Sequence, residues 1–528
     1  MTENSRKRKN CPYLDTIDRT ALDFDLEHTC SVTLETGPHI YACLVCGIFL
    51  RGRGPKTPTY THALQEGHLV FCHLAEGTFH CLPDNYEVED PSLQDIHDAL
   101  HPTYSLQKVR LLDQRDEMSR DLFGRLYLPG FVGLQNLHQT DCINAVVQAL
   151  AHVPPLRDYF LLQGGSSGGN ATTVAFGNAV RHIWSPHRFR SHVDPRQLVQ
   201  AWGSANKRNV GACVAWLLHQ LHTGTVDRRA TKQKKKQRSI VERVFQGKVR
   251  VTTRQAKRKS KPIAAADEEE EDDRVGSGDE DEAMTDPSPN DLEDAKKVEE
   301  SVLETKFLQL NVEIMEKPLF RDDDGGLVIP QEPLVTALQK FNGTTFVDAK
   351  SKTGAAQRKK YDILKFPDYL ILHLERFKDG EKNPTIVVFP VKNLDLTDFL
   401  SDQNHPTEEQ IRTMSIPELK SLVQRGGGRA AIEKSELVQA ALDVASLKYD
   451  LVANITHDSP SVVGREGAKA DPLQEGTYKC HVKAAAKQQW FEIQDLHVHQ
   501  VMPQQIGVSE SCLLIFERRS SRGSGSTV

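Results

Sequence analysis

The chain has 528 residues, which leaves room for roughly two to four domains of about 150 residues each. Its hydrophobic content of 38% and charged content of 26% are typical of a globular protein that also carries some disordered sequence. No apolar run reaches the ~18 residues that a membrane-spanning helix needs, and the N-terminus is polar, so we expect neither a membrane span nor a signal peptide. The net charge of -6 says little about partners, because it averages a basic block with an acidic one.

Ten cysteines are scattered through the chain, and one pair has CxxC spacing, which favours a metal site in a reducing compartment over a disulfide framework. In the first domain, which we place at residues 11–100, Cys43 and Cys46 form that pair, and His62 and His68 follow. Two thiolates and two imidazoles complete a tetrahedral Zn2+ shell. The pattern of CLVCG, GR and HALQEGH resembles the zinc finger of ubiquitin-specific proteases, the UBP-type finger.

Members of that finger family often bind more than one zinc ion and hold the free C-terminus of ubiquitin. Here Arg51 and Gly54 stand where the family has a cysteine and a tyrosine, which leaves Arg53 as the remaining partner for a carboxylate. The resemblance therefore implies weak or no ubiquitin binding. A second zinc site stays open, beside plain burial, for the further cysteines Cys11, Cys30 and Cys81.

Residues 101–128 are predicted to form a helical connector, which a Leu-Pro-Gly break separates from a second domain at residues 129–520. That domain opens with GLQNLHQTDCINAVVQAL at residues 133–150, a loop followed by a helix whose N-terminus would favour a thiolate. The stretch resembles the cysteine box of the ubiquitin-specific proteases, GLxNLGNTCYMNSxLQ, and the nucleophile column falls on Asp141. Because one helical step turns a side chain by about 100°, we expect Cys142 to pack under the helix instead.

Residues 175–220 have the helical spacing of that family's thumb. Residues 226–300 are predicted to be a charged disordered insertion, basic from 228 to 261 and acidic from 267 to 294, because such runs bury too little apolar surface to become ordered. A short apolar stretch within this insertion, SIVERVFQGKV, predicts a strand and a turn. Together with SRKRK in the basic N-terminal tip (residues 1–10), the basic part indicates nuclear import or an RNA contact.

The second half of the chain carries strand-like sequence. FPDYLILHLERF, followed by NPTIVVFPVKNLDL, resembles the palm pattern LPxxLxxHLKRF and FP…LDL, so His373 and Arg376 are expected at structural positions. Residues 400–447 interrupt the palm with a helical insertion that either binds a partner or only decorates a loop. Ser435 is the expected N-cap of the last of its helices, which are predicted at 408–413, 416–424 and 435–445. Residues 521–528 are predicted to be a disordered tail.

The last strands carry what remains of a catalytic apparatus. GTYKCHV stands where the family has GHYxAYV, so Thr477 replaces the general-base histidine. WFEIQDLHVHQV puts Gln494, with Asp495 beside it, in the place of the orienting Asp or Asn, and Asn136 matches the oxyanion donor. Cysteine proteolysis needs a thiolate, an imidazole base and a group that holds the ring, and Asp141, Thr477 and Gln494 supply none of them. Three further histidines are candidate bases but are expected at surface or structural positions, namely His481, His497 and His499.

These features predict an α+β protein: a small UBP-type zinc finger, then a papain-like domain of thumb, palm and fingers without its triad. That order, with CPYLDTIDR, FHCLPDNYEVED, LPGFVGL and EKNPTIVVFP, resembles the tri-snRNP-associated ubiquitin-specific-protease-like proteins, also called Sad-type. The resemblance implies a nuclear, non-catalytic pre-mRNA splicing factor, a scaffold for assembly or stability of the tri-snRNP that contacts snRNP proteins. Two alternatives stay open: an active deubiquitinase that uses Cys142, and a ubiquitin-binding adaptor outside splicing.

Overall fold

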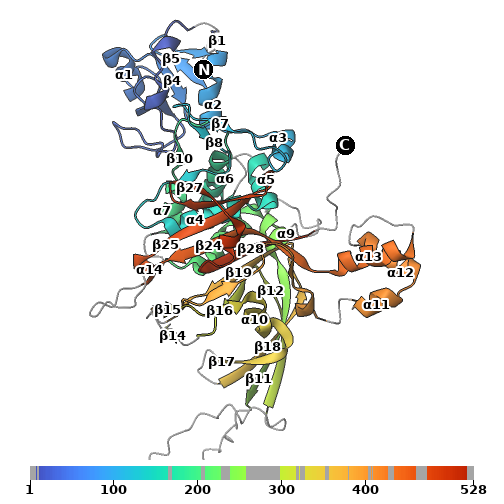
Figure 1. Cartoon of the computed structure of the whole chain (residues 1–528). Coiled ribbons are helices and arrows are strands. Elements are labelled where there is room, and N and C mark those ends of the chain that lie inside the picture. The colour runs from blue at the N-terminus through green and yellow to red at the C-terminus, as the bar shows by residue number, and fades with distance from the viewer. Residues whose placement is uncertain are drawn as a thin grey trace, which may run out of the picture.

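The described part of the chain forms a small N-terminal domain, a short connector and a larger domain of helices and sheets (Figure 1). In this computed structural model the predictions for the C-terminal tail and for the charged segments 227–237 and 257–297 fall outside the described residues. The described residues are 7–8, 11–163, 169–203, 208–226, 238–256, 298–316, 320–321, 327–350, 356–378, 380–401, 406, 408–425, 433–459 and 472–519.

The N-terminal domain, called the finger below, is built on one sheet with the strand order β1-β6-β5-β4-β2-β3. Helix α1 (Pro58–Glu66) begins with proline at its first position and ends at Gly67, whose φ of +69° suits glycine. Helix α2 (Gln94–Leu100) contributes Ile96 and Leu100 to the same core as the sheet. The strands are β1 (Lys7–Arg8), β2 (Ile40–Cys43), β3 (Phe49–Arg51), β4 (Val70–His73), β5 (Phe79–Cys81) and β6 (Tyr86–Val88).

The connector differs from the predicted helical segment. It begins with helix α3 (Leu106–Leu111) but ends in a hairpin of β7 (Ser119–Arg120) and β8 (Leu126–Tyr127). The side chain of Asp121 accepts hydrogen bonds from two following backbone amides at 3.0 and 2.8 Å, and Gly124 has a φ of +77°. Asp followed by Gly in this arrangement favours a turn over a helix, so the predicted helix at the end of the connector was wrong.

Helices form one side of the larger domain, and α4 (Asp141–Ala151) is buried along its whole length against β24 and β25. Such a helix must be apolar on nearly every side, as the sequence INAVVQALA is. None of the described helices is long and apolar enough to cross a membrane. The others in this layer are α5 (Pro154–Gln163), α6 (Ala171–Ile183), α7 (Arg196–Trp202), α8 (Val210–Thr225) and α9 (Ile240–Phe245).

The central sheet of the larger domain has the order β13-β19-β28-β24-β25-β26-β27, with β23 beside β24. Only the β13–β19 pair in it is parallel among the described strands. Its strands are β13 (Leu310–Glu313), β19 (Tyr369–Glu375), β23 (Leu394–Asp395), β24 (Lys448–Asp458), β25 (Thr477–Ala484), β26 (Gln489–Gln494), β27 (His497–Val501) and β28 (Ser511–Arg518).

His373 and Arg376, from the β19 motif, have structural surroundings. Arg376 is 1% exposed, and its guanidinium donates to the carbonyls of Ser511, Asn383 and Thr385 at 2.6 to 2.9 Å. The ring of His373 lies against Gly211 of α8, where a Cβ would approach it to 2.4 Å. Both side chains therefore support the palm, as predicted.

A second sheet, with the order β12-β11-β18-β17, extends away from the body (Figure 1). The apolar island SIVERVFQGKV is not a strand and a turn: it forms α9, whose N-terminus has a capping box of Ser239 and Glu242, followed by β11. Part of the range 226–300 is therefore ordered, because β11 pairs along its length with both β12 and β18. The strands are β11 (Gly247–Ala256), β12 (Val298–Phe307), β17 (Asn342–Lys350) and β18 (Ala356–Lys365).

Short elements complete the larger domain. Strand β9 leads into the loop before α4 and pairs with β10. The bounds are β9 (Gly133–Leu134), β10 (His192–Val193), β14 (Phe320–Arg321), β15 (Leu327–Val328), β16 (Gln331–Pro333), β20 (Phe377–Lys378), β21 (Glu381–Lys382), β22 (Ile386–Val388), α10 (Leu334–Ala337), α14 (Pro472–Glu475) and α15 (Pro503–Ile506).

The helical insertion contains α11 (Glu408–Thr413), α12 (Ile416–Arg425) and α13 (Lys434–Ala445), close to the predicted bounds, and projects from the body (Figure 1). The predicted N-cap was wrong, because Glu433 holds that position and Ser435 lies in the first turn. The helices share a small core of their own, formed by Ile411, Leu419, Val423, Leu437, Ala441 and Ala445.

Candidate functional site

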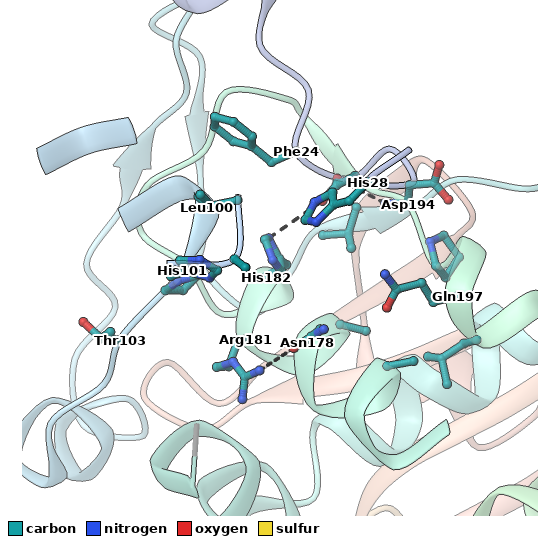
Figure 2. A pocket seen from close by; sticks show the side chains of 18 residues that line it. Phe24, His28, Leu100, His101, Thr103, Asn178, Arg181, His182, Asp194 and Gln197 are labelled. Carbon is teal, nitrogen blue, oxygen red and sulfur yellow. Dashed lines mark hydrogen bonds and ion pairs between the residues drawn. The ribbon is translucent and has the colours of Figure 1, made fainter. Parts of the chain in front are cut away.

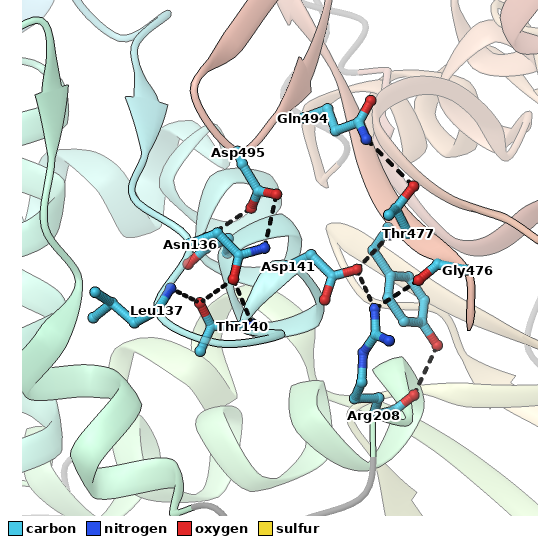
Figure 3. Close-up of polar contacts among 11 residues, drawn as sticks. Asn136, Leu137, Thr140, Asp141, Arg208, Gly476, Thr477, Gln494 and Asp495 are labelled. Carbon is cyan, nitrogen blue, oxygen red and sulfur yellow. Dashed lines mark hydrogen bonds and ion pairs between the residues drawn. The ribbon is translucent and has the colours of Figure 1, made fainter. Parts of the chain in front are cut away.

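The position of the expected nucleophile lies at the first residue of α4 (Figure 3). Asp141 occupies it and is only 2% exposed. Its Oδ2 accepts a hydrogen bond from the backbone N–H of Tyr478 at 2.8 Å and forms an ion pair with the guanidinium of Arg208. The dipole of α4 also favours negative charge at this end. A buried, paired carboxylate thus fills the place where a cysteine hydrolase carries its thiolate.

Arg208 reaches Asp141 from the loop before α8. Its Nη2 also donates to the carbonyl of Gly476 at 2.9 Å, and the hydroxyl of Tyr478 donates to the carbonyl of Arg208 at 2.9 Å (Figure 3). The ion pair and these bonds join α4, β25 and the loop before α8. The sequence carried no signal for Arg208, because its partners Asp141 and Gly476 are 67 and 268 residues away along the chain.

Thr477 and Gln494, the predicted replacements for the base and its orienting group, lie in neighbouring strands. Gln494 Nε2 donates to Thr477 Oγ1 at 3.3 Å (Figure 3). Thr477 directly precedes Tyr478, whose backbone N–H binds Asp141. The structure therefore brings all three degenerate positions to one place. Neither a hydroxyl nor a primary amide takes up a proton near neutral pH, so this pair supplies no general base.

Asn136, the residue at the oxyanion position, is bound within the protein. Its Nδ2 donates to Asp495 Oδ2 at 2.9 Å, and its Oδ1 accepts from the Thr140 N–H at 3.0 Å. Asn144, one turn into α4, donates to the other oxygen of Asp495 at 3.0 Å. From the sequence, Asp495 was identified only as the neighbour of Gln494. In the structure its carboxylate accepts hydrogen bonds from the side-chain amides of Asn136 and Asn144. A fixed negative charge next to Asn136 would oppose an oxyanion in the same place.

Cys142 packs in the core, as predicted from its helical position. It is 3% exposed and lies against Cys213 of α8. Contact with the Cys213 thiol and burial raise the pKa of Cys142 well above its usual value. Since the thiolate is the reactive form, this buried neutral thiol is unsuited to act as a nucleophile.

The candidate histidines lie in β25 and β27, where His497 is the cross-strand partner of Gln494 and is exposed. His481 is four residues along β25 from Thr477, about 13 Å for an extended strand, and its Nε2 lies 3.0 Å from Glu492. His497 and His499 stack at the edge strand β27, with ring centroids 6.1 Å apart. All three have structural or surface positions, as expected.

His457 of β24 is a buried imidazole near this site that sequence reasoning missed. A Cβ on Gly476 would lie 2.1 Å from its Cε1, so glycine is required there. The ring is 0% exposed and packs edge-on against Tyr478. Burial lowers the pKa of His457 to about 3, which makes it a poor proton acceptor at neutral pH.

The four predicted metal ligands meet in the finger. The distances are 3.6 Å from Cys43 Sγ to His68 Nδ1, 3.4 Å from Cys46 Sγ to His62 Nε2, and 3.1 Å between the two histidine nitrogens. A tetrahedral zinc shell has S···N edges of about 3.5 Å and N···N edges of about 3.3 Å. Within the described ranges, no other group of three or more His, Cys, Asp or Glu side chains brings its ligand atoms as close together. The donor set and its spacing therefore fit a bound metal ion.

The other finger cysteines do not form a shared site. The hydroxyl of Tyr86 donates to Cys11 Sγ at 3.3 Å, and burial together with this cluster raises the pKa of Cys81 to about 11. Cys30 instead accepts a hydrogen bond from the backbone of Thr33 at 3.5 Å. The structure supports plain burial of these thiols over a second three-cysteine metal site.

Arg53, the expected partner for a free carboxylate, already has a neighbour. Its Nη1 lies 2.9 Å from Nδ1 of His80, and burial followed by the Arg53 charge lowers the pKa of His80 to about 4. The neutral imidazole therefore accepts from the guanidinium. Arg51 pairs with Glu35 beside it. An incoming carboxylate would have to compete with these contacts.

The finger docks on the larger domain at a junction that encloses a cavity of about 470 Å3 between the finger and α6 and α7 (Figure 2). One ion pair crosses this junction, with Asp23 of the finger 3.4 Å from Arg190 of the larger domain. Asp25 lies 3.8 Å from His182, but burial lowers the pKa of His182 to about 3, so this contact is not a pair of opposite charges. A partly exposed ion pair such as Asp23–Arg190 stabilises little.

The larger domain matches the family model described as ubiquitin carboxyl-terminal hydrolase over residues 132–516. The finger matches the model described as a zinc finger in ubiquitin-hydrolases and other proteins over residues 28–93. Because the first match covers more than half of the chain, the chain belongs to the ubiquitin carboxyl-terminal hydrolase family. The predicted α+β class and the order of finger and protease-like domain are confirmed.

Two relatives and one structure show the likeness in detail. "Ubiquitin carboxyl-terminal hydrolase 39" of Homo sapiens is 36% identical, over 99% of this chain and 82% of the relative. "Probable mRNA-splicing protein ubp10" of Schizosaccharomyces pombe is 31% identical, over 96% of this chain and 88% of the relative. A structure described as "Crystal structure of an essential yeast splicing factor" has a TM-score of 0.63 at 21% identity and covers 96% and 100% of the two chains, which shows a shared fold. The resemblance to splicing-associated members of the family is confirmed.

Replacing Arg208 with alanine should leave Asp141 buried and charged without its cation, so we expect the free energy of unfolding to fall by about 3–5 kcal/mol. Urea unfolding followed by circular dichroism measures this loss. The double variant Asp141→Asn with Arg208→Ala should recover a large part of it, because no unpaired ion then remains. Arg412→Ala, which removes a 64% exposed partner of Glu408, is the matched control and should change stability by less than about 1 kcal/mol. A double variant as unstable as Arg208→Ala would contradict the role of the ion pair.

Proposed function

We propose that the chain is a non-catalytic pre-mRNA splicing factor that serves as a scaffold in assembly or stability of the spliceosomal tri-snRNP. The observation that carries the non-catalytic part is the buried ion pair of Asp141 with Arg208 at the nucleophile position. The splicing part is supported by the names of the relatives, which include "Pre-mRNA-splicing factor SAD1" of Saccharomyces cerevisiae, 24% identical over 97% of this chain.

Chemical reasoning supports the absence of proteolysis. Removing the nucleophile or the base of a catalytic triad typically costs ~10⁶ in rate. In this chain the nucleophile position holds Asp141, which Arg208 already pairs, and the base position holds Thr477, which has no basic nitrogen. The nearby imidazole of His457 is buried, and Cys142 is neutral. The domain retains the surfaces of its family without the reaction.

The finger has a structural role in this proposal. Cys43, Cys46, His62 and His68 hold one Zn2+, which fixes the loop after β2 to the end of α1. Weak or no binding of free ubiquitin is supported by the contact of Arg53 with His80, because a carboxylate ligand would displace it. The finger is thus a docking surface.

The proposed partners are snRNP proteins of the tri-snRNP, and the proposed location is the nucleus. Both follow from the splicing role and agree with the basic sequences SRKRK and KQKKKQR. An RNA contact through the basic part of the charged insertion belongs to the same proposal, because Lys and Arg runs bind phosphate backbones.

A ubiquitin-vinyl probe, which traps reactive cysteines, should not label the chain above background, because no thiolate stands at the site. Gel shift or mass spectrometry reads the result, with an active ubiquitin-specific protease as the positive control. Labelling that disappears in Cys142→Ala would show an active deubiquitinase instead.

Metal analysis should find about one zinc per chain, because only one set of ligands in the described residues fits it. Cys46→Ala should lose that zinc, and a strong chelator should loosen the finger while the larger domain stays folded, as read by hydrogen exchange. Cys30→Ala is the matched control and should retain the metal. Retention of zinc in Cys46→Ala would overturn this ligand set.

Affinity purification of the tagged chain from its own cells should recover spliceosomal small nuclear RNAs and snRNP proteins, and depletion should leave transcripts unspliced. Since the proposed role is non-catalytic, Cys142→Ser should restore splicing as well as the unmodified chain does. Sequencing of RNA after depletion and rescue measures both. A chain that purifies without these RNAs, or a splicing defect that only the unmodified chain repairs, would contradict the proposal.

A further inference from the structure

The connector ends in a hairpin that lies between the finger and the helices of the larger domain, and we call residues 118–127 the connector hairpin (Figure 1). Its strands β7 and β8 pair with Ser119 opposite Tyr127 and with Arg120 opposite Leu126. Opposite residues of an antiparallel pair point to the same side of the sheet. The hairpin therefore has an inner face with Ser119 and Tyr127 and an outer face with Arg120 and Leu126.

The inner face of the connector hairpin is held by the larger domain. The hydroxyl of Tyr127 donates to the carbonyl of Ser185 at 3.1 Å, and the guanidinium of Arg188 lies 5.8 Å from the centroid of the Tyr127 ring. On the outer face, Arg120 and Leu126 are both exposed. The fold thus uses one side of the hairpin and leaves the other side in solvent.

Hydrogen bonds fix the tip of the connector hairpin, which carries Phe123. The carboxylate of Asp121 accepts from the backbone N–H groups of Phe123 and Arg125 at 3.0 and 2.8 Å. The backbone N–H of Asp121 donates to the carbonyl of Arg125 at 3.0 Å, and the guanidinium of Arg120 donates to the carbonyl of Gly124 at 2.9 Å. A turn held at this many points presents its side chains in one arrangement, which lowers the entropy lost when a partner binds.

The aromatic side chain at this tip is in solvent, because Phe123 is 63% exposed. Among the Phe, Tyr and Trp side chains whose burial the structure describes, it is the only exposed one. Burying such a side chain stabilises a protein by about 1.5–3 kcal/mol, a gain that the fold does not use. Met118 and Leu126 of the same hairpin are 48% and 56% exposed. Since aromatic and methionine side chains are enriched where proteins bind one another, the hairpin has the composition of a docking site.

The exposed charge on the connector hairpin is positive. Arg120 and Arg125 are exposed, and neither forms an ion pair with another described residue. The nearest acids along the chain are already engaged, since the carboxylate of Asp121 is bound by the turn and Glu117 lies 3.6 Å from Arg115. Two guanidinium groups thus stand on either side of Phe123 in the sequence, and a surface that carries carboxylates complements them.

A protein suits this surface better than a single strand of RNA does. Single-stranded nucleic acids bind in basic grooves where several aromatic rings stack on successive bases. The connector hairpin instead has one exposed ring at the end of a turn, together with the aliphatic side chains of Met118 and Leu126. An apolar pocket of a protein would cover the ring, and carboxylates at the rim of that pocket would pair with the arginines.

We propose that the connector hairpin is a docking surface for a protein component of the tri-snRNP, one with an apolar pocket that takes Phe123 and with Asp or Glu side chains that pair with Arg120 and Arg125. The proposal rests on the proposed splicing function and adds the place of contact. Phe123 is the anchor of this interface, because a few buried aromatic side chains carry most of the binding free energy between proteins. The two arginines orient the partner and make the binding depend on salt.

The test measures binding of the full chain, labelled with a fluorescent dye, to tri-snRNP purified from the same cells after removal of the native chain. Phe123→Ala should weaken this binding about tenfold or more, the loss that follows from removing an interface anchor. Leu303→Ala, which removes an apolar side chain with the same 63% exposure on β12, is the matched control and should bind like the unmodified chain. Unchanged binding by Phe123→Ala would overturn the docking surface and leave the splicing role standing.

The charge requirement is tested with a second variant. Arg120→Gln combined with Arg125→Gln should weaken the binding at low salt, and its difference from the unmodified chain should shrink at high salt. Arg412→Gln, which removes a 64% exposed arginine on α11, is the control and should bind like the unmodified chain. Circular dichroism checks that each variant is folded. If Phe123→Ala unfolds, the double arginine variant decides whether the hairpin is the docking surface, and unchanged binding by that variant would overturn it.

Photocrosslinking identifies the class of partner. With p-benzoylphenylalanine in place of Phe123, irradiation of the bound particle should join the chain to a protein. A crosslink to small nuclear RNA, or no crosslink within a bound particle, would overturn the proposal. An unmodified chain that does not bind the particle at all would instead overturn the proposed function, and this inference with it.

Discussion

The ion pair of Asp141 with Arg208 joins three segments of the larger domain that are far apart in the sequence. Two charges taken from water remain stable only when each has its partner and its hydrogen bonds. Here those bonds come from α4, from β25 and from the loop before α8, so these segments must stay in contact. The helix that carries Asp141 is buried along its length, which leaves no direction in which it could move away from the sheet. At the position where the sequence places the nucleophile column, the structure has a buried ion pair.

Other side chains around Asp141 also have contacts within the protein. The donor of Asn136 is taken by Asp495, and Gln494 is bonded to Thr477, so these side chains have partners within the protein. Networks of this kind become rigid when their members are paired. In the finger, Cys43 and His68 come from different elements and lie 3.6 Å apart, in a cluster whose donor set fits a metal ion.

Local patterns were reliable where one short segment carries the information. The CxxC pair with His62 and His68 predicted four side chains that meet in one cluster, and the register of the cysteine box predicted Asp141 at the helix N-terminus with Cys142 turned inward. Two predictions failed for different reasons. At the end of the connector a local turn signal, Asp121 and Gly124, was missed, and the segment forms a hairpin. Within the charged range, β11 forms because the distant strands β12 and β18 pair with it.

By itself, the sequence determined the family and the order of the finger and the protease-like domain, because residue type and spacing along one helix or strand are readable without the rest of the chain. It also placed Asp141, Thr477 and Gln494 at the three catalytic columns. Tertiary structure decided which residues surround those positions. Arg208, Asp495 and His457 reach the site from segments that are distant in sequence. Burial and pairing depend on contacts across the whole fold, and no local pattern encodes them.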